Sequence, residues 1–463
     1  MRRWTPLLLL AALAGCGQGP SATRPPIPPA GSTGAALEVR VSGLPDGLAP
    51  ALRIRGGRVD ESFSGAKTFT DLPPGTYTVS SSPVQNASAT LRYSAVDAPT
   101  VTLAAGERRV VVLAHMPAYL RSTADRPDDT AGFQVHVVYT LPRDAPDRQL
   151  DTNGQIHRSI SAIQTWLKSQ TGGAGLRLDT AGGNLDVSFV RLNQTDAELE
   201  ATGPLLRNYI ENELMGLGYT DPDKIYAVYH DGSSRFSCGG GAWPPLLFGN
   251  AGVMFLRGKP PGAPTCDSNE LGASPTRPQY LDFGMLHETF HTLGATPQCA
   301  PHHTLEGHAS DSPTDLMYSG SQPWQPSTLD LGRNDYYGHG RGDCVDLAKS
   351  AFLEPSAPGA TPPPGWPWAL VPDLGCDLLG QVQAGIGEQL NLRFVNTRRE
   401  PVDVYFIDGR GSPLLAGEVQ PFAGLDFISF TMHPWLVRTK SGQCVGVYRP
   451  GTFLAKQGVV LVK

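Results

Sequence analysis

The chain has 463 residues, of which only 17% are charged, and its formal net charge is −6 at pH 7. Its length corresponds to roughly two to four domains of ordinary size. The mild acidity argues against nucleic acid or an anionic membrane surface as the main partner. Glycine (53 residues) and proline (42 residues) are abundant, which indicates a β-rich protein with many turns and loops.

The first residues have the pattern of an export signal. Two arginines precede an apolar stretch at residues 7–13 that is too short to cross a bilayer. The sequence Leu-Ala-Gly-Cys16 that follows resembles a bacterial lipobox, which implies that Cys16 is lipidated and becomes the mature N-terminus. We therefore predict a lipoprotein signal peptide with its lipobox at residues 1–16 and a Pro-rich tether at 17–35. The protein is expected to be an exported lipoprotein, held on the extracytoplasmic side of a bacterial membrane by a lipid anchor.

Residues 36–118 are predicted to form an accessory β-sandwich domain. Apolar and polar residues alternate over 38–41 and 76–79, and an apolar run at 110–113 is bounded by turn residues. The segment 69–79 resembles the turn-and-strand motif of transthyretin-like and carboxypeptidase-regulatory-like modules. No pattern in this region supports chemistry, so we expect a spacer.

Residues 125–355 are predicted to form the catalytic domain. Helical and strand periodicities indicate a strand at 133–139, a helix at 156–167, a strand at 185–190, a helix at 203–215, and strands at 224–229 and 251–256. Four histidines lack the spacing of metal ligands and are interpreted as packing or surface residues: His115, His136, His157 and His230.

The strongest chemical signal is the HExxH motif His287-Glu288-Thr289-Phe290-His291. Apolar residues around it indicate a helix over 281–293, and Gly294 is suited to end that helix. Two histidines four residues apart project from one helix face and can reach the same metal ion. Glu288 lies beside them and can act as a general base toward water. The motif therefore predicts a catalytic zinc site, with a protein or peptide as the substrate.

The residues after the motif extend it to HExxHxxG, which resembles the opening of the metzincin peptidases. A metzincin has its third ligand three residues beyond the glycine, where this chain has Pro297, which lacks a donor atom. Further on, His308 followed by Leu-Met317-Tyr resembles the third histidine and the Met-turn of that family. The resemblance implies that residues 295–306 are an insertion, that His308 is the third zinc ligand and that Met317 forms the floor beneath the ligands.

Other residues remain alternatives for the third ligand, because zinc accepts both nitrogen and oxygen donors. His302 is the main alternative, and His303 lies in the same insertion. Asp311 and Asp315 are carboxylate candidates.

The sequence Cys-Gly-Gly-Gly-Ala-Trp-Pro-Pro at 238–245 resembles a loosely characterised group of secreted bacterial zincins. The order of strand, long helix, strands and active-site helix resembles the N-terminal subdomain of a metzincin. These resemblances imply a multidomain protein with an α+β, metzincin-like zincin domain flanked by two all-β sandwich domains. Tyr336 or Tyr337, after the Met-turn, is a candidate donor to a developing oxyanion; the alternative is an aromatic loop tethered by Cys344.

Six cysteines besides Cys16 occur in a chain predicted to be exported, which indicates three disulfides. Proximity along the sequence favours three pairs: Cys238–Cys266, Cys299–Cys344 and Cys376–Cys444.

A Pro-rich linker at 356–368 precedes a predicted β domain at 369–463, with strands expected at 390–395, 402–407 and 459–462. Phe394-Val-Asn, Pro401-Val-Asp-Val-Tyr and Phe430-Thr-Met-His-Pro-Trp-Leu resemble the β domain of the von Hippel–Lindau tumour suppressor, which binds a hydroxyproline peptide. The resemblance implies a pocket for a Pro-rich ligand formed by Ser429, His433 and Trp435. Leu415 stands in the region where that family has a pocket tyrosine, and the alternative for all three residues is a structural role.

These observations favour a secreted, lipid-anchored zinc endopeptidase. One alternative is a cell-surface binding protein whose zincin domain is inactive, although the intact Glu288 argues against it. Another alternative is a zinc hydrolase that acts on a bond other than a peptide bond.

Overall fold

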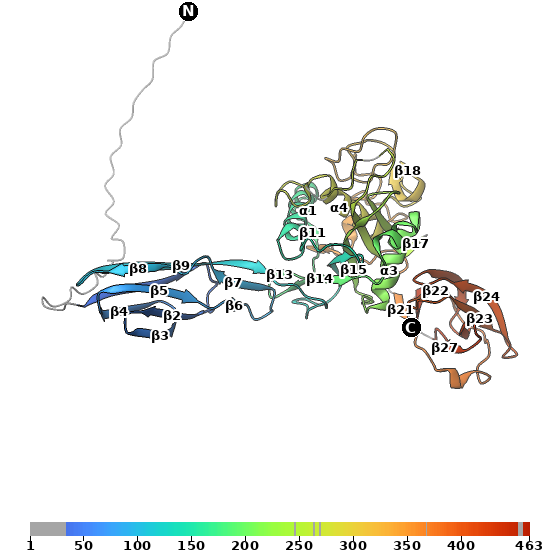
Figure 1. The fold of residues 1–463 in the computed structure, drawn as a ribbon. Helices are drawn as coiled ribbons and strands as arrows, with labels where there is room; N and C mark the ends of the chain where they lie inside the picture. Colours follow the sequence, from blue (N-terminus) through green and yellow to red (C-terminus); the bar gives the residue numbers. More distant parts are fainter. Residues whose placement is uncertain (1–33, 245–246, 263, 268–269, 367, 452–456) are drawn as a thin grey trace, which may run out of the picture. The chain divides into compact units, whose positions relative to one another are not determined.

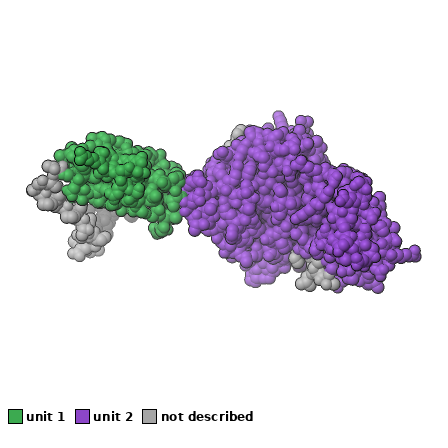
Figure 2. All heavy atoms as spheres, turned by 60° about the horizontal axis from the view of Figure 1, so that its bottom comes forward, with its two compact units in different colours: residues 1–84, 94–116 green, residues 85–93, 117–463 purple. Residues whose placement is uncertain are grey.

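The computed structural model describes residues 34–244, 247–262, 264–267, 270–366, 368–451 and 457–463, and it shows a β-rich, multidomain chain (Figure 1). Cys16, the signal peptide and nearly all of the predicted tether lie outside the described residues. No helix within the described ranges has the length and apolar character needed to span a membrane. The chain divides into two compact units, residues 1–84 with 94–116 and residues 85–93 with 117–463 (Figure 2).

The N-terminal region consists of two antiparallel-rich sheets with the orders β4-β1-β9-β7-β6 and β3-β2-β5-β8. Alternate residues of these strands, such as Leu37, Ile54 and Tyr77, are buried between the sheets, which explains their period-two pattern. The strands predicted at 38–41, 76–79 and 110–113 lie within β1, β5 and β9 and are confirmed. The bounds are β1 (Ala35–Ser42), β2 (Ala51–Gly56), β3 (Val59–Ser64), β4 (Lys67–Leu72), β5 (Gly75–Ser81), β6 (Val84–Gln85), β7 (Leu91–Ala95), β8 (Thr100–Leu103) and β9 (Arg108–Tyr119).

A five-stranded sheet with the order β14-β10-β15-β17-β16 is the centre of the second unit. Its strands are parallel except for β16, which pairs antiparallel with β17 at the edge. Strand β10 is buried along its whole length because helices cover both faces of the sheet. The bounds are β10 (Gln134–Leu141), β14 (Val187–Arg191), β15 (Lys224–Ser233), β16 (Gly239–Trp243) and β17 (Leu247–Arg257).

Helices α1 (Gln155–Thr171) and α4 (Tyr280–Thr292) share one hydrophobic core with one face of this sheet. Helix α3 (Leu206–Gly216) shares a second core with strand residues of the opposite face, among them Val138 and Val228. The predicted helices and strands of this region all form, in the predicted order. Shorter elements connect them: β11 (Gly175–Leu176), β12 (Thr180–Ala181), β13 (Asn184–Leu185), α2 (Asp196–Glu200), β18 (His303–Thr304), β19 (His308–Ala309) and β20 (Leu353–Glu354).

The C-terminal region is a sandwich of two four-stranded sheets, with the orders β21-β28-β22-β25 and β24-β23-β26-β27. Its core contains Phe394, Val404 and Trp435. It belongs to the same compact unit as the five-stranded sheet, and Met215 of α3 packs in one cluster with residues of β21, β22 and β28. The bounds are β21 (Trp368–Leu370), β22 (Gln389–Asn396), β23 (Val402–Ile407), β24 (Pro413–Val419), β25 (Gly424–Phe430), β26 (Trp435–Thr439), β27 (Cys444–Tyr448) and β28 (Gln457–Val462).

Three disulfides join the pairs that the sequence spacing favours, so this prediction is confirmed. They are Cys238–Cys266, Cys299–Cys344 and Cys376–Cys444.

Candidate metal centre and active-site cleft

Helix α4 is fixed at both ends. At its start, Gln279 and Asp282 form a capping box in which the Gln279 N–H donates to Asp282 Oδ2 at 2.8 Å. The other oxygen of Asp282 accepts a hydrogen bond from the Ser159 hydroxyl of α1 at 2.5 Å. At its end, Gly294 adopts a φ of 84°, which confirms its predicted role as the residue that stops the helix. The helix is therefore held in register with α1 and the sheet.

Three histidine side chains lie close together beside the edge strand β16. His287 Nε2 lies 3.0 Å from His291 Nε2, and His291 Nε2 lies 3.2 Å from His308 Nε2. Ligand nitrogens around a tetrahedral zinc, each about 2.0–2.1 Å from the metal, lie about 3.3 Å from one another. The structure thus brings both α4 histidines together with His308, and the three nitrogens have the spacing of one facial ligand set.

The ring orientations leave the Nε2 atoms available as ligands. His287 Nδ1 donates to the Leu316 carbonyl at 2.7 Å, and His308 Nδ1 donates to the Leu305 carbonyl at 3.0 Å. Because a carbonyl can only accept, a neutral ring carries its proton on Nδ1 and its lone pair on Nε2. Burial, together with the His308 ring, lowers the pKa of His287 to about 3 and that of His291 well below its usual value. Neutral imidazoles with inward lone pairs fit a bound metal ion.

Glu288 lies in the cleft next to this cluster. Burial raises the pKa of its carboxyl group to about 8, and the nearby Arg207 guanidinium opposes that rise. The glycines of β16 make room for it, since a Cβ atom on Gly239 would lie 2.4 Å from Glu288 Oε1. A Cβ on Gly241 would lie 2.5 Å from the Glu288 carbonyl oxygen and from His291 Cβ. The glycine run therefore allows the edge strand to lie directly against the helix that carries the motif.

The turn that contains Met317 is held by a buried carboxylate. Asp315 Oδ1 accepts the Met317 N–H at 2.8 Å and the Tyr336 hydroxyl at 2.9 Å. Burial raises the pKa of Asp315 to about 7. Met317 is fully buried, and the preceding carbonyl, that of Leu316, is the group that orients His287. Asp315 therefore supports the turn and is not part of the histidine cluster.

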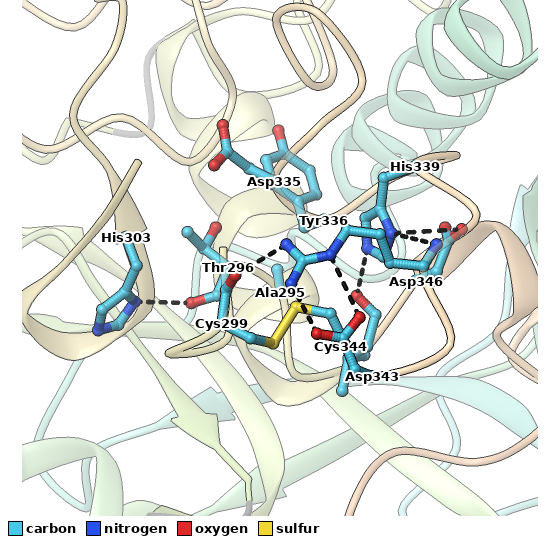
Figure 3. The surroundings of a disulfide bond; sticks show 12 residues. Ala295, Thr296, Cys299, His303, Asp335, Tyr336, His339, Asp343, Cys344 and Asp346 are labelled. Atoms are coloured by element: carbon cyan, nitrogen blue, oxygen red, sulfur yellow. Dashed lines mark hydrogen bonds and ion pairs between the residues drawn. A yellow bond between two sulfur atoms is a disulfide. The ribbon is translucent and has the colours of Figure 1, made fainter. Parts of the chain in front are cut away.

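The prediction that Tyr336 donates to an oxyanion is wrong, because its hydroxyl is bonded to Asp315 in the core. Tyr337 also fails to reach the site: it is buried in the same core and lines neither of the recesses described below. Both backbone N–H groups donate to Asp330 Oδ2, at 2.8 Å from Tyr336 and 2.6 Å from Tyr337. Figure 3 shows Tyr336 beside the Cys299–Cys344 disulfide, in agreement with the alternative of an aromatic loop tethered by Cys344.

The alternative third ligands lie elsewhere. His302 Nδ1 is 2.9 Å from Asp335 Oδ2, and these two residues form a separate group with Asp311. His303 Nδ1 donates to the Thr296 carbonyl at 3.0 Å (Figure 3). Its ring stacks on Trp243, with 5.4 Å between ring centroids. Neither His302 nor His303 joins the cluster around His291.

Two recesses flank the histidine cluster. One has a volume of about 260 Å³ and is lined by aromatic residues that include Tyr280, Tyr318 and Trp324. The other has a volume of about 610 Å³ and is lined both by residues of β16 and by residues of the 295–308 segment. Both are lined by Phe236, Ser237, Gly239, Glu288 and His308. The arrangement is an open cleft that passes across the three histidines.

Sequence reasoning missed most residues that line this cleft. Phe236 and Leu305 are large apolar side chains with exposed fractions of 61% and 84%, and both lie at its margins. Trp324 donates its indole N–H to the Asp315 and Leu316 carbonyls, at 3.1 Å and 3.2 Å. No motif marks these residues, and only their nearness to the Cys238 and Met317 segments could have indicated them.

The four histidines interpreted as packing residues lie outside the cluster. His136 Nδ1 is 2.6 Å from Asp179 Oδ2, and His230 Nδ1 is 2.9 Å from the Thr140 hydroxyl. His115 Nε2 is 2.8 Å from the Ser81 hydroxyl, and His157 stacks on Tyr119.

The predicted peptide pocket of the C-terminal region is not open to a ligand at two of its three residues. Ser429 is fully buried and accepts a hydrogen bond from the Trp435 indole N–H at 3.0 Å. Trp435 packs among Phe394, Phe406 and Phe427. The His433 ring lies between aromatic rings, and the backbone N–H of His433 donates to the Phe430 carbonyl at 3.0 Å. The pocket prediction is therefore wrong for Ser429 and Trp435, whose positions match the structural alternative.

Comparisons with known proteins add little to this geometry. No protein-family model matches the sequence, and no curated protein matches it. Among solved structures, the chain has a likeness to catalytically inactive OgpA from Akkermansia muciniphila in complex with an O-glycopeptide substrate, glycodrosocin. The TM-score is 0.28 and the sequence identity 12%, over 69% of this chain and 92% of that chain. A likeness at this level does not establish a shared fold, so the function is inferred from the site alone.

Proposed function

We propose that this protein is a zinc-dependent endopeptidase of the metzincin type. The observation that carries the proposal is the convergence of three Nε2 atoms beside Glu288 in an open cleft. His287, His291 and His308 would hold the metal and leave one coordination position open to the cleft. When bound there, zinc supplies Lewis-acid polarisation of a substrate carbonyl and makes water more acidic.

The remaining steps belong to side chains and backbone of this chain. The Glu288 carboxylate accepts the proton of the attacking water and returns it to the nitrogen of the leaving amine. Strand β16 has a single neighbour in the described sheet, so its outer backbone groups can pair with an extended peptide. Such pairing would lay the substrate along the cleft and across the three histidines. The side chains of Phe236 and Tyr318 would then contact residues on either side of the scissile bond.

The test is metal analysis combined with a general protease assay on purified protein, with Glu288→Ala beside the wild type. The proposal expects about one zinc per chain in both proteins and proteolysis in the wild type alone. Zinc in both proteins without proteolysis would favour a hydrolase for another bond, which a panel of ester and amide substrates would identify. Absence of zinc from the wild type would favour the binding protein with an inactive domain.

We further propose that the protein is exported and anchored through lipid on Cys16. The signal-like N-terminus and the lipobox support this, and three disulfides suit an oxidising compartment. Cys16→Ser should move the protein from the membrane fraction to the soluble fraction, because residues 7–13 are too short to anchor it. A Ser variant that still sediments with membranes after signal processing would contradict the lipid anchor.

A further inference from the structure

The segment between Gly294 and His308 has to return a ligand to helix α4 without the short turn expected three residues after the glycine. Pro297 occupies that position and has no donor atom. His308 instead begins the second strand of a small hairpin in which β18 pairs antiparallel with β19, with Thr304 opposite His308. A longer connection has more conformations available, so other contacts must fix where the hairpin stands relative to α4.

Trp243, the last residue of β16, contacts the start of this segment. Its indole N–H donates to the Ala295 carbonyl at 3.0 Å, directly after the residue that ends α4. Two residues earlier on the same strand, Gly241 lies against α4 so closely that a Cβ would be 2.5 Å from His291 Cβ. Trp243 is therefore attached to a strand whose position is already set against a metal-ligating histidine.

The same indole contacts the middle and the end of the segment. The His303 ring stacks on it with an interplanar angle of 13°. Gly307 has a φ of 77°, and a Cβ atom there would lie 2.3 Å from Trp243 Nε1. The Gly307 backbone thus lies against the ring, one residue before His308. One side chain contacts three points of the connection between the second and third histidines.

We propose that Trp243 is a positioning residue for the metal centre. Its indole fixes residues 295–307 so that His308 Nε2 lies within ligand-set distance of His291 Nε2. The inference rests on the proposed zinc function and deepens it. It accounts for a third ligand that follows an insertion. It also gives the tryptophan after the glycine run a role that sequence analysis did not assign.

The Cys299–Cys344 disulfide restrains the segment at a different place. It joins the segment to the loop after Tyr336 (Figure 3). Arg341 of that loop donates from Nη1 to the Cys299 carbonyl at 2.9 Å. This anchor acts upstream of the hairpin, whereas Gly307 touches Trp243 immediately before the ligand. The Trp243 contacts should therefore affect the ligand geometry more than the disulfide does.

The test compares Trp243→Phe with a matched control, Trp366→Phe. Trp366 also packs among aromatic rings, but its indole N–H is buried without a hydrogen-bond partner in the described structure. Zinc affinity is measured by competition with a chromophoric chelator, ligand geometry by the visible spectrum of the cobalt(II) protein, and stability by thermal unfolding of the metal-free protein. We expect Trp243→Phe to bind zinc about tenfold more weakly than the control and Gly307→Ala about a hundredfold more weakly, the range for residues that orient ligands.

In the supporting result, the cobalt(II) spectrum of Trp243→Phe changes while its metal-free melting temperature matches that of the control. Zinc affinity equal to that of Trp366→Phe would overturn the inference. So would an unchanged cobalt(II) spectrum with a lowered melting temperature, because that result describes a purely structural tryptophan. A wild-type protein that binds no zinc would instead refute the proposed function, so the two failures are distinguishable.

Discussion

The described residues of the second unit include three groups of metal-binding residue types, and two of them differ instructively: the one formed by His287, His291 and His308 and the one around His136. In the second cluster, Lys224 Nζ lies 2.7 Å from Asp125 and 2.8 Å from Asp179. Burial opposes the charge of this lysine, but its hydrogen bonds to the carboxylates raise its pKa above the usual value. The ammonium group therefore supplies the positive charge that balances these aspartates.

The histidine cluster differs because burial lowers the pKa values of His287 and His291, and because the Nδ1–H bonds of His287 and His308 to carbonyl groups leave the lone pairs of these two rings on Nε2. Burial in the second cluster would raise the pKa of Asp179, yet hydrogen bonds from His136 and Lys224 lower it. That cluster is a closed network of opposite charges, whereas the first brings three ring nitrogens close together, with the lone pairs of at least His287 and His308 on Nε2. Proximity of ligand atoms is thus insufficient to identify a metal site, and the direction of the lone pairs decides.

The largest effect is expected for a substitution beside the histidine cluster. Glu288→Ala should lower peptide turnover by about a hundredfold or more, the usual scale for a general base, while zinc content stays unchanged. Steady-state kinetics and metal analysis of the same preparation provide the measurement. Turnover like that of the wild type would refute the role of Glu288.

The second prediction compares two histidines of the 295–308 segment as candidates for the third zinc ligand. His308→Ala should weaken zinc binding by more than the tenfold to hundredfold typical of residues that only orient ligands. His302→Ala is the matched control, since its imidazole is paired with Asp335, and its zinc affinity should stay close to that of the wild type. Chelator competition measures both, and the reverse ranking would assign the third ligand to His302.

Lys224→Met should break the closed network without touching the metal centre. It leaves the buried Asp179 without its ammonium partner, and we expect a loss of about 3 kcal/mol in the free energy of unfolding. Urea denaturation of the metal-free protein measures this loss. Zinc affinity should remain unchanged, and a large fall in affinity would show that the two clusters are coupled.

The smallest effect is expected at a buried hydrogen-bonded pair of side chains in the C-terminal sandwich. Ser429→Ala removes the acceptor of the buried Trp435 indole N–H and should lower the free energy of unfolding by about 1–3 kcal/mol. Ser429→Thr keeps a hydroxyl group and serves as the comparison in the same urea titration. A stability equal to that of the wild type in Ser429→Ala would show that the indole finds another acceptor.

Periodicity predicted the elements of this fold well because alternate burial leaves a direct mark on the sequence. The strands at β10, β15 and β22 and the helix at α4 were found in this way. The position of His308 could be predicted only through a resemblance to metzincins, since its contacts involve residues far along the chain. The error at Tyr336 has the same origin, because nothing near it reveals that Asp315 accepts its hydroxyl hydrogen bond. Likewise, Ser429 and Trp435 matched a pocket by position, while packing placed them in a core.

The glycines of β16 limit how the specificity of this cleft can change. Any side chain at Gly239 or Gly241 would collide with the helix that bears the HExxH motif, so substitutions at these two positions should displace the strand from the helix. Phe236 and Leu305 lie on the margins and are largely exposed. A library built to alter substrate preference would therefore vary these two positions and leave the strand untouched, and natural divergence is expected to follow the same route.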